Sequence, residues 1–326
     1  MKILLTGGAG FIGHNVVRVL EQQGHQCSIL DSLTGYGIIP DRDIVYLANH
    51  RLERVRCEPN IGDIRDPAVN TVFKIFDPDV VIHLASFPRQ KVANQNPVLA
   101  SDVMSAGLVN LLEASKRANV KKFVYISSSM VYGDFDNDVT ELAECNPRGS
   151  YAILKYSGEK LVEDYSEHFD YTIVRPSAVY GEWDVEDRVI SKFITQAMRD
   201  ECLQVNGADE VLDFTYVEDT AKGIALASTS EHSQSKIYNI TRSSDKLWTL
   251  KMAAELATSI AGLGTIKINQ RDLAFPKRGR LSSELAKKEL GYNPQVDFEQ
   301  GLVKYYEWYQ QHPQLWSKDI YGKEIV

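Results

Sequence analysis

The chain has 326 residues, of which 44% are hydrophobic and 25% are charged, a composition that provides a sizeable core and argues against disorder. A formal net charge of −8 offers no basic surface for nucleic acid or for an anionic membrane, so neither is an expected partner. No apolar run reaches the ~18 residues of a membrane-spanning helix. The four cysteines form no CxxC pair and the histidines show no ligand spacing, so we expect no metal site and a reducing, cytoplasmic location.

Short apolar runs alternate with amphipathic stretches through the first half of the chain. The runs predict strands at Lys2–Thr6, Gln26–Asp31, Asp79–Leu84, Lys122–Ser127 and Tyr171–Arg175. The amphipathic stretches predict helices at Gly13–Gln23, Pro97–Ala118 and Tyr151–His168. Continuously apolar strands are typical of a sheet covered on both faces. We therefore expect an α/β fold with a Rossmann-type, doubly wound parallel sheet.

The second half reads as a smaller, mixed α/β lobe. Helical patterns are joined there by longer polar segments with few strands, and they cover Arg188–Asp200, Glu218–Ser228, Thr249–Ala261, Ser282–Leu290 and Phe298–Gln311. The composition shift places the boundary near Pro176. We expect one domain over 1–175, to which segments around 213–240 return, and a substrate-binding lobe over 176–326, with a cleft between them.

A glycine triplet follows the first strand directly. Gly7, Gly10 and Gly13 stand at a GxxGxxG spacing, and a helix is predicted to follow. A tight turn and close backbone approach favour glycine, and a helix N-terminus offers free N–H groups to a pyrophosphate. Asp31, which ends the second strand, is the acid expected to bind an adenosine ribose and to repel a 2′-phosphate. No Arg or Lys lies between Asp31 and Pro40, and this favours NAD over NADP.

Tyr151 and Lys155 stand four residues apart on a predicted helix, so their side chains share one face. A lysine ammonium near a phenol favours the phenolate, and we expect Lys155 to lower the pKa of Tyr151 toward neutrality. The result would be a usable general base. The hydroxyls of Ser127–Ser129 end a predicted strand and add a partner for this pair.

Together these motifs make the chain similar to the extended short-chain dehydrogenase/reductases, specifically the NAD-dependent nucleotide-sugar epimerases and dehydratases of the UDP-glucose 4-epimerase type. The resemblance covers nearly the whole length. Besides the glycine loop it rests on Asp31–Gly35, Gly62–Asp66, His83–Ser86, Ser127–Gly133, Tyr151–Lys155, Arg175–Gly181, Asp213–Asp219 and Leu290–Tyr292.

The resemblance implies an NAD site along the first domain. Asp63 and Ile64 would flank the adenine, and Lys155 would hold the nicotinamide ribose. The full set implied for the cofactor is Gly7, Gly10, Phe11, Ile12, Gly13, Asp31, Asp63, Ile64, Leu84, Ala85, Ser86, Tyr151, Lys155 and Pro176. His83, at the end of a buried strand, is interpreted as a core histidine and not as the base.

The resemblance also implies which reaction is catalysed. Matching Val131-Tyr132-Gly133 to the family's Val-Tyr-Gly places the catalytic hydroxyl at Ser128, beside Tyr151 and Lys155. The 4,6-dehydratases of the family carry Asp and Glu at the next two positions, where this chain has Ser129 and Met130. A thioether cannot transfer a proton, so elimination loses its acid and base. The expected activity is NAD-dependent inversion of C4 through a 4-keto sugar.

Other readings of the same residues stay open. A 4-keto sugar reductase or C4 dehydrogenase would use Ser128, Tyr151 and Lys155 and release NADH, and a dehydratase is less favoured. A non-catalytic NAD-sensing regulator would not need these three residues together.

The expected substrate is a nucleotide-diphosphate sugar, but three positions depart from the family pattern. Met104, Ala178 and Leu212 stand where Asn, Asn and Arg are usual, so the substrate need not be the common UDP-glucose/UDP-galactose pair. An Arg for the diphosphate is available in 276–280, and 87–91 is expected to face the sugar. The predicted substrate set is Lys91, Ser128, Ser129, Tyr151, Ala178 and Arg278.

A homodimer is also expected. The two helices predicted over 97–118 and 151–168 carry more apolar residues than one stripe needs, and the resemblance implies a four-helix contact between copies. The apolar residues concerned are Val98, Leu99, Val103, Leu108, Leu111, Leu112, Leu154, Leu161 and Val162.

Overall fold

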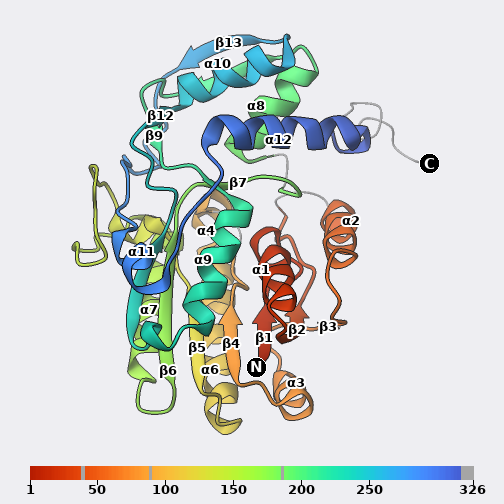
Figure 1. Ribbon diagram of the computed structural model, residues 1–326, viewed down its shortest axis with the longest axis vertical. Helices are drawn as coiled ribbons and strands as arrows, with labels where there is room; N and C mark the ends of the chain where they lie inside the picture. Colours follow the sequence, from red (N-terminus) through yellow and green to blue (C-terminus); the bar gives the residue numbers. More distant parts are fainter. Residues whose placement is uncertain (38–40, 88–89, 185–186, 317–326) are drawn as a thin grey trace.

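The computed structural model describes residues 1–37, 41–87, 90–184 and 187–316. Its centre is a seven-stranded sheet in the order β11-β6-β5-β4-β1-β2-β3, and all neighbouring strands are parallel (Figure 1). The strands are β1 (Lys2–Thr6), β2 (Gln26–Asp31), β3 (Pro59–Ile61), β4 (Val80–His83), β5 (Lys122–Ile126), β6 (Asp170–Pro176) and β11 (Lys236–Ile240). The doubly wound parallel sheet predicted from the sequence is confirmed.

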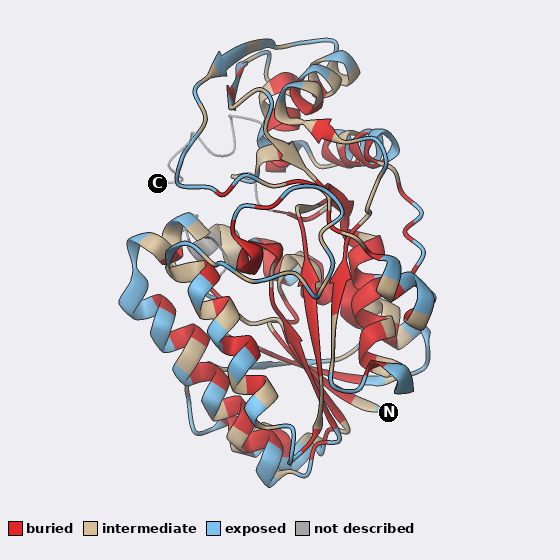
Figure 2. Cartoon of the chain, turned by 90° about the vertical axis from the view of Figure 1, so that its left-hand side faces the viewer, coloured by how far each residue is buried: buried red, intermediate tan, exposed pale blue. Residues whose placement is uncertain are grey.

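Helices cover both faces of this sheet (Figure 2). On one face Ile3 and Leu5 pack under α1 (Phe11–Gln22), α9 (Val217–Thr229) and α11 (Glu284–Leu290). On the other face Leu4 packs under α3 (Val69–Phe76), α6 (Gly107–Arg117) and α7 (Gly149–Asp164). Because successive side chains of a strand point to opposite faces, a continuously apolar strand serves both cores at once.

The second lobe has a core of its own. It contains α8 (Val189–Met198), α10 (Leu250–Ala261) and α12 (Phe298–Gln311), together with the parallel pair β8 (Cys202–Asn206) and β13 (Thr265–Asn269). Short strand pairs connect the lobes, namely β7 (Val179–Tyr180) with β10 (Thr215–Tyr216), and β9 (Val211–Leu212) with β12 (Trp248–Thr249). The chain crosses between the lobes, since α9 packs on α1 and β11 pairs with β6 before α10 begins.

Several elements differ from the sequence-based prediction. The helices α2 (Asp41–Leu52), α3 and α4 (Gln90–Gln95) and the strand β3 were not predicted, and the second lobe holds more strands than expected. The single helix expected over 97–118 is interrupted, because a π-helical segment (Asp102–Ala106) separates α5 (Pro97–Ser101) from α6. A π turn has the same apolar composition as an α turn, so a hydrophobic pattern does not reveal it.

The apolar residues on which the dimer prediction rested are mostly internal. Val103, Leu108, Leu111, Leu112 and Val162 are fully buried in the protein's own core, and that part of the argument is wrong. They cover the sheet face that α3, α6 and α7 share. The apolar side chains that α5, α6 and α7 do expose are Val98, Leu99, Val109 and Ile153.

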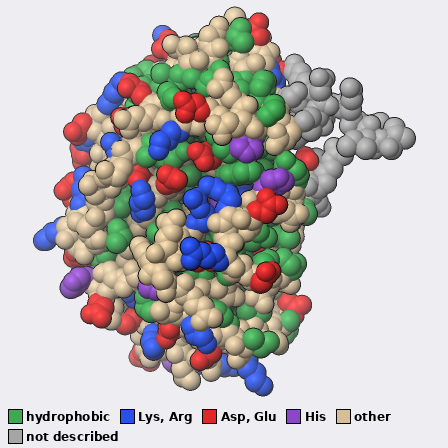
Figure 3. All heavy atoms as spheres, turned by 45° about the vertical axis from the view of Figure 1, so that its right-hand side comes forward, with side chains coloured by type: hydrophobic (Ala, Val, Ile, Leu, Met, Phe, Trp, Pro, Cys, Tyr) green, Lys and Arg blue, Asp and Glu red, His purple; other side chains and the backbone are tan. Residues whose placement is uncertain are grey.

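By length and composition alone, the helical stretch Pro97–Arg117 could cross a membrane. The sequence predicts no membrane-spanning helix, because the chain contains no continuous apolar run of sufficient length. Half of the most apolar window of this stretch is buried in the protein, as is typical of a core helix. Figure 3 shows acidic and basic side chains interspersed on the face drawn.

The turn after β1 makes a prediction about stability. Gly7 has φ +75°, and a Cβ there would lie 2.5 Å from the backbone nitrogen of Ala85, whereas Gly24 has φ +82° with open space around it. Gly24→Ala should cost only the ~1–2 kcal/mol of a left-handed residue. Gly7→Ala should lower the unfolding free energy by more, because the loop must move off β4. Urea denaturation of both variants measures the difference, and equal losses would contradict it.

Candidate active site

One cavity of about 930 Å³ lies at the carboxyl edge of the central sheet and extends into the second lobe. Its wall includes the turns after β1, β2, β4 and β5, the start of α7 and residues of α8 and β8. Every residue that the sequence assigned to the cofactor or the substrate lines this cavity. Their separate roles remain predictions, but the structure brings all of them together.

The glycine loop is shaped for close approach by a phosphate. A Cβ on Gly13 would overlap the carbonyl oxygen of Gly7, and Gly7 itself has no room for one. The helix α1 then begins without a side-chain cap at Gly10. The amides of its first turn, at Phe11, Ile12 and Gly13, have no helix carbonyl four residues earlier to which they can donate, so they are free to bind an anion. These residues fit the pyrophosphate of a dinucleotide.

Two carboxylates border the cavity near this loop. Asp31 accepts hydrogen bonds from the amides of Ala9 and Leu33, each at 2.9 Å, which orient its carboxylate. Burial raises the pKa of Asp31, against the lowering effect of those amides. Asp63 instead forms a two-pronged ion pair with Arg65, at 3.0 and 2.7 Å, which lowers the pKa of Asp63. Asp31 is therefore the better placed of the two to meet a ribose.

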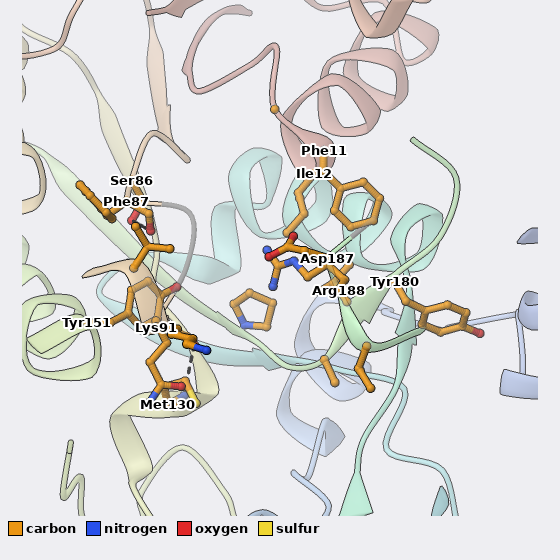
Figure 4. Close-up of a pocket in the computed structure, with 18 of the residues that line it drawn as sticks. Phe11, Ile12, Ser86, Phe87, Lys91, Met130, Tyr151, Tyr180, Asp187 and Arg188 are labelled. Carbon is orange, nitrogen blue, oxygen red and sulfur yellow. Dashed lines mark hydrogen bonds between the residues drawn. The ribbon is translucent and has the colours of Figure 1, made fainter. Parts of the chain in front are cut away.

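Ser128 and Tyr151 meet at the centre of the cavity wall. Ser128 follows β5 in an extended conformation and accepts a hydrogen bond from the amide of Met130 at 3.2 Å. Tyr151 lies in the first turn of α7, where its amide donates to Oδ1 of Asn94. The Ser128 hydroxyl lies close enough to the Tyr151 phenol to lower the pKa of Tyr151. Figure 4 shows Tyr151, Lys91 and Met130 on the side of the cavity opposite Phe11 and Ile12.

Lys155 is only 4% exposed, and its ammonium donates a 2.7 Å hydrogen bond to the carbonyl of Ile126. Burial lowers the pKa of Lys155 to about 7. Burial also raises the pKa of Tyr151, and the groups that oppose this rise are the Arg188 guanidinium and the Ser128 hydroxyl. In the protein chain by itself, the expectation that Lys155 lowers the pKa of Tyr151 is therefore wrong. Both side chains line the cavity, Lys155 buried in its wall and Tyr151 partly exposed.

His83 lies behind this wall, in the core. Its Nδ1 is 2.6 Å from the hydroxyl of Thr6, and burial lowers its pKa to about 3. It therefore carries no charge near neutral pH and does not line the cavity. The interpretation of His83 as a core residue agrees with this position.

The predicted substrate residues have different surroundings. Lys91 is exposed, while Arg278 is partly buried. Burial lowers the pKa of Arg278 to about 10, and its buried Nε has no hydrogen-bond partner among the described residues. Ala178 lines the cavity with φ +41°. Of the three unusual positions, Ala178 and Leu212 face the cavity, whereas Met104 is buried away from it. Pro88 and Arg89 of the predicted sugar-facing loop lie outside the described residues.

Other polar residues of the cavity were not predicted. Asp187 and Arg188 enter from the segment before α8 (Figure 4), and Gln204, Asn206 and Arg271 line its far end. Arg188 begins a predicted helix, and Arg271 lies close to the basic run at 277–280. Neither residue belongs to a sequence motif, so the sequence did not indicate that they line the cavity. Among the described residues, no group of three His, Cys, Asp or Glu side chains could hold a metal ion.

Comparison with known proteins agrees with this arrangement. Residues 3–241 match the NAD dependent epimerase/dehydratase family. UDP-glucuronate 4-epimerase 5 of Arabidopsis thaliana is 30% identical over 340 residues, which cover 95% of this chain and 75% of that protein. The UDP-glucuronic acid 4-epimerase of Bacillus cereus, solved with UDP-glucuronic acid and NAD, superimposes with a TM-score of 0.87 at 26% identity, covering 96% of this chain and all of that one.

The likeness extends to a second reaction type. DesIV of Streptomyces venezuelae, a dTDP-glucose 4,6-dehydratase solved with NAD, has a TM-score of 0.85 at 25% identity over 97% of this chain and 99% of its own. The fold thus does not separate epimerases from dehydratases. The glycine loop, the oriented Asp31 and the Ser128–Tyr151–Lys155 group all fit the NAD on which these proteins depend. The chain belongs to the NAD dependent epimerase/dehydratase family, and it is an enzyme of that family.

Proposed function

We propose that the protein is an epimerase that inverts C4 of a nucleotide-linked sugar through a transient 4-keto sugar. The observation that carries this proposal is the composition of the wall beside Ser128 and Tyr151. Ser129 and Met130 stand there, both nearly fully buried, and Met130 lines the cavity. Neither a hydroxyl without a base nor a thioether can serve as the acid and base that elimination of water requires. Oxidation and re-reduction at C4 need only the residues present.

The chain's own residues move one proton in this reaction. Tyr151 takes the proton of the C4 hydroxyl and returns it, and Ser128, whose hydroxyl lies near the phenol, shares that proton. Bound NAD supplies the hydride acceptor and donor. Lys155, held by the Ile126 carbonyl, lines the cavity, and its ammonium would bind the nicotinamide ribose.

The far end of the cavity supports a nucleotide-diphosphate sugar as substrate. Arg278 leaves a buried Nε without a partner among the described residues, and a guanidinium matches the geometry of phosphate oxygens. Gln204 and Asn206, on β8, can hydrogen-bond a base. Near Tyr151 the cationic Arg188 faces the sugar region, so both neutral and acidic sugars belong among the candidates.

The test is incubation with a panel of nucleotide sugars in deuterated water, followed by NMR. The panel includes UDP-glucose, UDP-glucuronic acid and dTDP-glucose, each with NAD. We expect inversion at C4 without deuterium at C5 and without net NADH. Deuterium at C5 would indicate elimination and would overturn the argument from Met130. Accumulation of NADH with a released ketone would instead identify a dehydrogenase.

The catalytic assignment predicts an order of losses. Tyr151→Phe keeps the ring but removes the base, so turnover should fall by ~10²–10⁴-fold. Ser128→Ala removes only the hydroxyl partner and should cost less. Tyr156→Phe is the matched control, because it makes the same change one turn further along α7 and should leave turnover unchanged. Steady-state kinetics give the three values, and near-native turnover of a folded Tyr151→Phe protein would refute the assignment.

We also infer that two copies associate through α5, α6 and α7. These helices contact one another and expose Val98 (84%), Val109 (37%) and Ile153 (48%). A twofold contact would cover this apolar patch on both copies at once.

Sedimentation should therefore give twice the chain mass of 36.7 kDa. Val98→Asp with Ile153→Asp should give the monomer mass, because each charge would be buried twice at a twofold contact. Ile268→Asp, at a position 48% exposed on β13 of the second lobe, away from α5, α6 and α7 (Figure 1), should leave the dimer intact. A monomeric wild type at micromolar concentration would contradict the inference.

A further inference from the structure

A buried carboxylate lies directly beneath the predicted catalytic residues and has no role in the reaction described above. Glu159 is completely inaccessible and follows Lys155 by one turn of α7. Its Oε1 accepts hydrogen bonds from the Ser127 hydroxyl at 2.5 Å and from Nε of Arg175 at 2.9 Å. Its Oε2 accepts a second bond from Arg175 at 2.6 Å. Because Arg175 donates to both oxygens of Glu159, the two side chains are held in a single relative orientation.

The pair continues into a wider hydrogen-bond network. Arg175, on β6, donates also to the Tyr132 hydroxyl at 2.9 Å, and its guanidinium lies 4.8 Å from the centre of that ring. Tyr132 in turn donates to the side chain of Asn239 on β11 at 2.8 Å. Helix α7 is thereby tied to the segment after β5 and to two strands of the sheet. A rigid connection of this kind transmits a displacement of Glu159 to each of its partners.

Each partner of Glu159 adjoins a predicted site residue in the chain. Ser127 immediately precedes Ser128, and Arg175 immediately precedes Pro176. The amide of Ser127 also donates to the carbonyl of Val174, so the ends of β5 and β6 are locked together. Lys155 shares a helix face with Glu159 because the two are four residues apart. The Glu159 carboxylate therefore binds Ser127 and Arg175, the residues that precede Ser128 and Pro176, and it lies one helical turn from Lys155.

Glu159 is also the counter-charge of Lys155. The other titratable groups that face Lys155 are Tyr125 on β5 and His83 on β4, and both stay neutral because burial raises the pKa of Tyr125 and lowers that of His83. Burial lowers the pKa of Lys155, and Glu159 acts in the opposite direction. The groups that face Glu159 itself are Tyr125, Cys145, Lys155, Lys160 and Arg175.

We propose that Glu159 is the positioning residue of this active site, which holds Ser128 in place through Ser127 and keeps Lys155 in its ammonium form. The proposal rests on the function proposed above, in which that ammonium binds the cofactor ribose and Ser128 shares the substrate proton. Glu159 touches neither substrate nor cofactor. It acts through the two residues that do.

The test is the pH dependence of turnover in Glu159→Gln. Loss of the negative charge lowers the pKa of Lys155 further, so the ammonium is lost at a lower pH and the alkaline limb of the profile should move down by about one pH unit or more. Ser127→Ala removes one hydrogen bond but keeps the charge, so it should lower kcat without moving that limb. Glu163→Gln, one turn further along α7 and paired only with Lys160 in its described ion pair, is the matched control and should change neither.

Two further measurements separate the role of Glu159 from the loss of its partner for Arg175 and from a failure of the proposed sugar chemistry. Because Glu159→Gln leaves Arg175 buried without its carboxylate, the double variant Glu159→Gln/Arg175→Gln is measured beside it, and it should show the same downward shift. NAD affinity is measured by calorimetry across the same pH range, and the pH above which it falls should move down in parallel. An unshifted limit in either folded variant would overturn the proposal. If the wild type leaves every sugar unchanged, the C4 chemistry fails, while the NAD titrations still decide the role of Glu159.

Discussion

The burial of the central sheet on both faces is the constraint on which the rest of this structure depends. Parallel strands need a crossover between each pair, and helices of those crossovers cover both faces. The carboxyl ends of all strands then lie at the same edge of the sheet. Side chains at this edge lie outside the apolar core and can be polar. The turns after β1, β2, β4 and β5 meet there and form the wall of the cavity.

Burial also sets the electrostatics of the active site. Burial in the cavity wall moves the pKa of Tyr151 and that of Lys155 in the direction that favours the neutral side chain. A base and an ammonium are useful there only if other groups oppose that effect. Arg188 and Ser128 do so for the phenol, and Glu159 does so for the ammonium. The chemistry is thus shared between residues that face the cavity and charges that lie behind it.

Elements that depend on neighbouring residues in the chain could be predicted from the sequence, whereas features that depend on tertiary packing could not. The strands β1 and β2 were predicted to the residue, because their apolar runs are continuous and end in a glycine turn or an acid. The three-residue strand β3 gave no such signal, since Asn60 and Ile61 are largely exposed at the sheet edge. From the sequence alone, the apolar residues of α6 are compatible both with a dimer interface and with the protein core. Only the packing of α3 and α7 beside them assigns them to the core.

The residues of the glycine loop, Asp31, Tyr151 and Lys155 could be proposed from the sequence alone, because each belongs to a short motif whose spacing has a local physical reason. Ser128 was proposed from the family resemblance, and all of these residues line the cavity. The direction of the Lys155 ammonium, the approach of Arg188 to the phenol and the pairing of Glu159 with Arg175 could not be predicted in this way. These depend on segments distant in the chain that come within hydrogen-bond reach only after the sheet forms. Coulombic and desolvation effects act through space, so only the tertiary structure decides them.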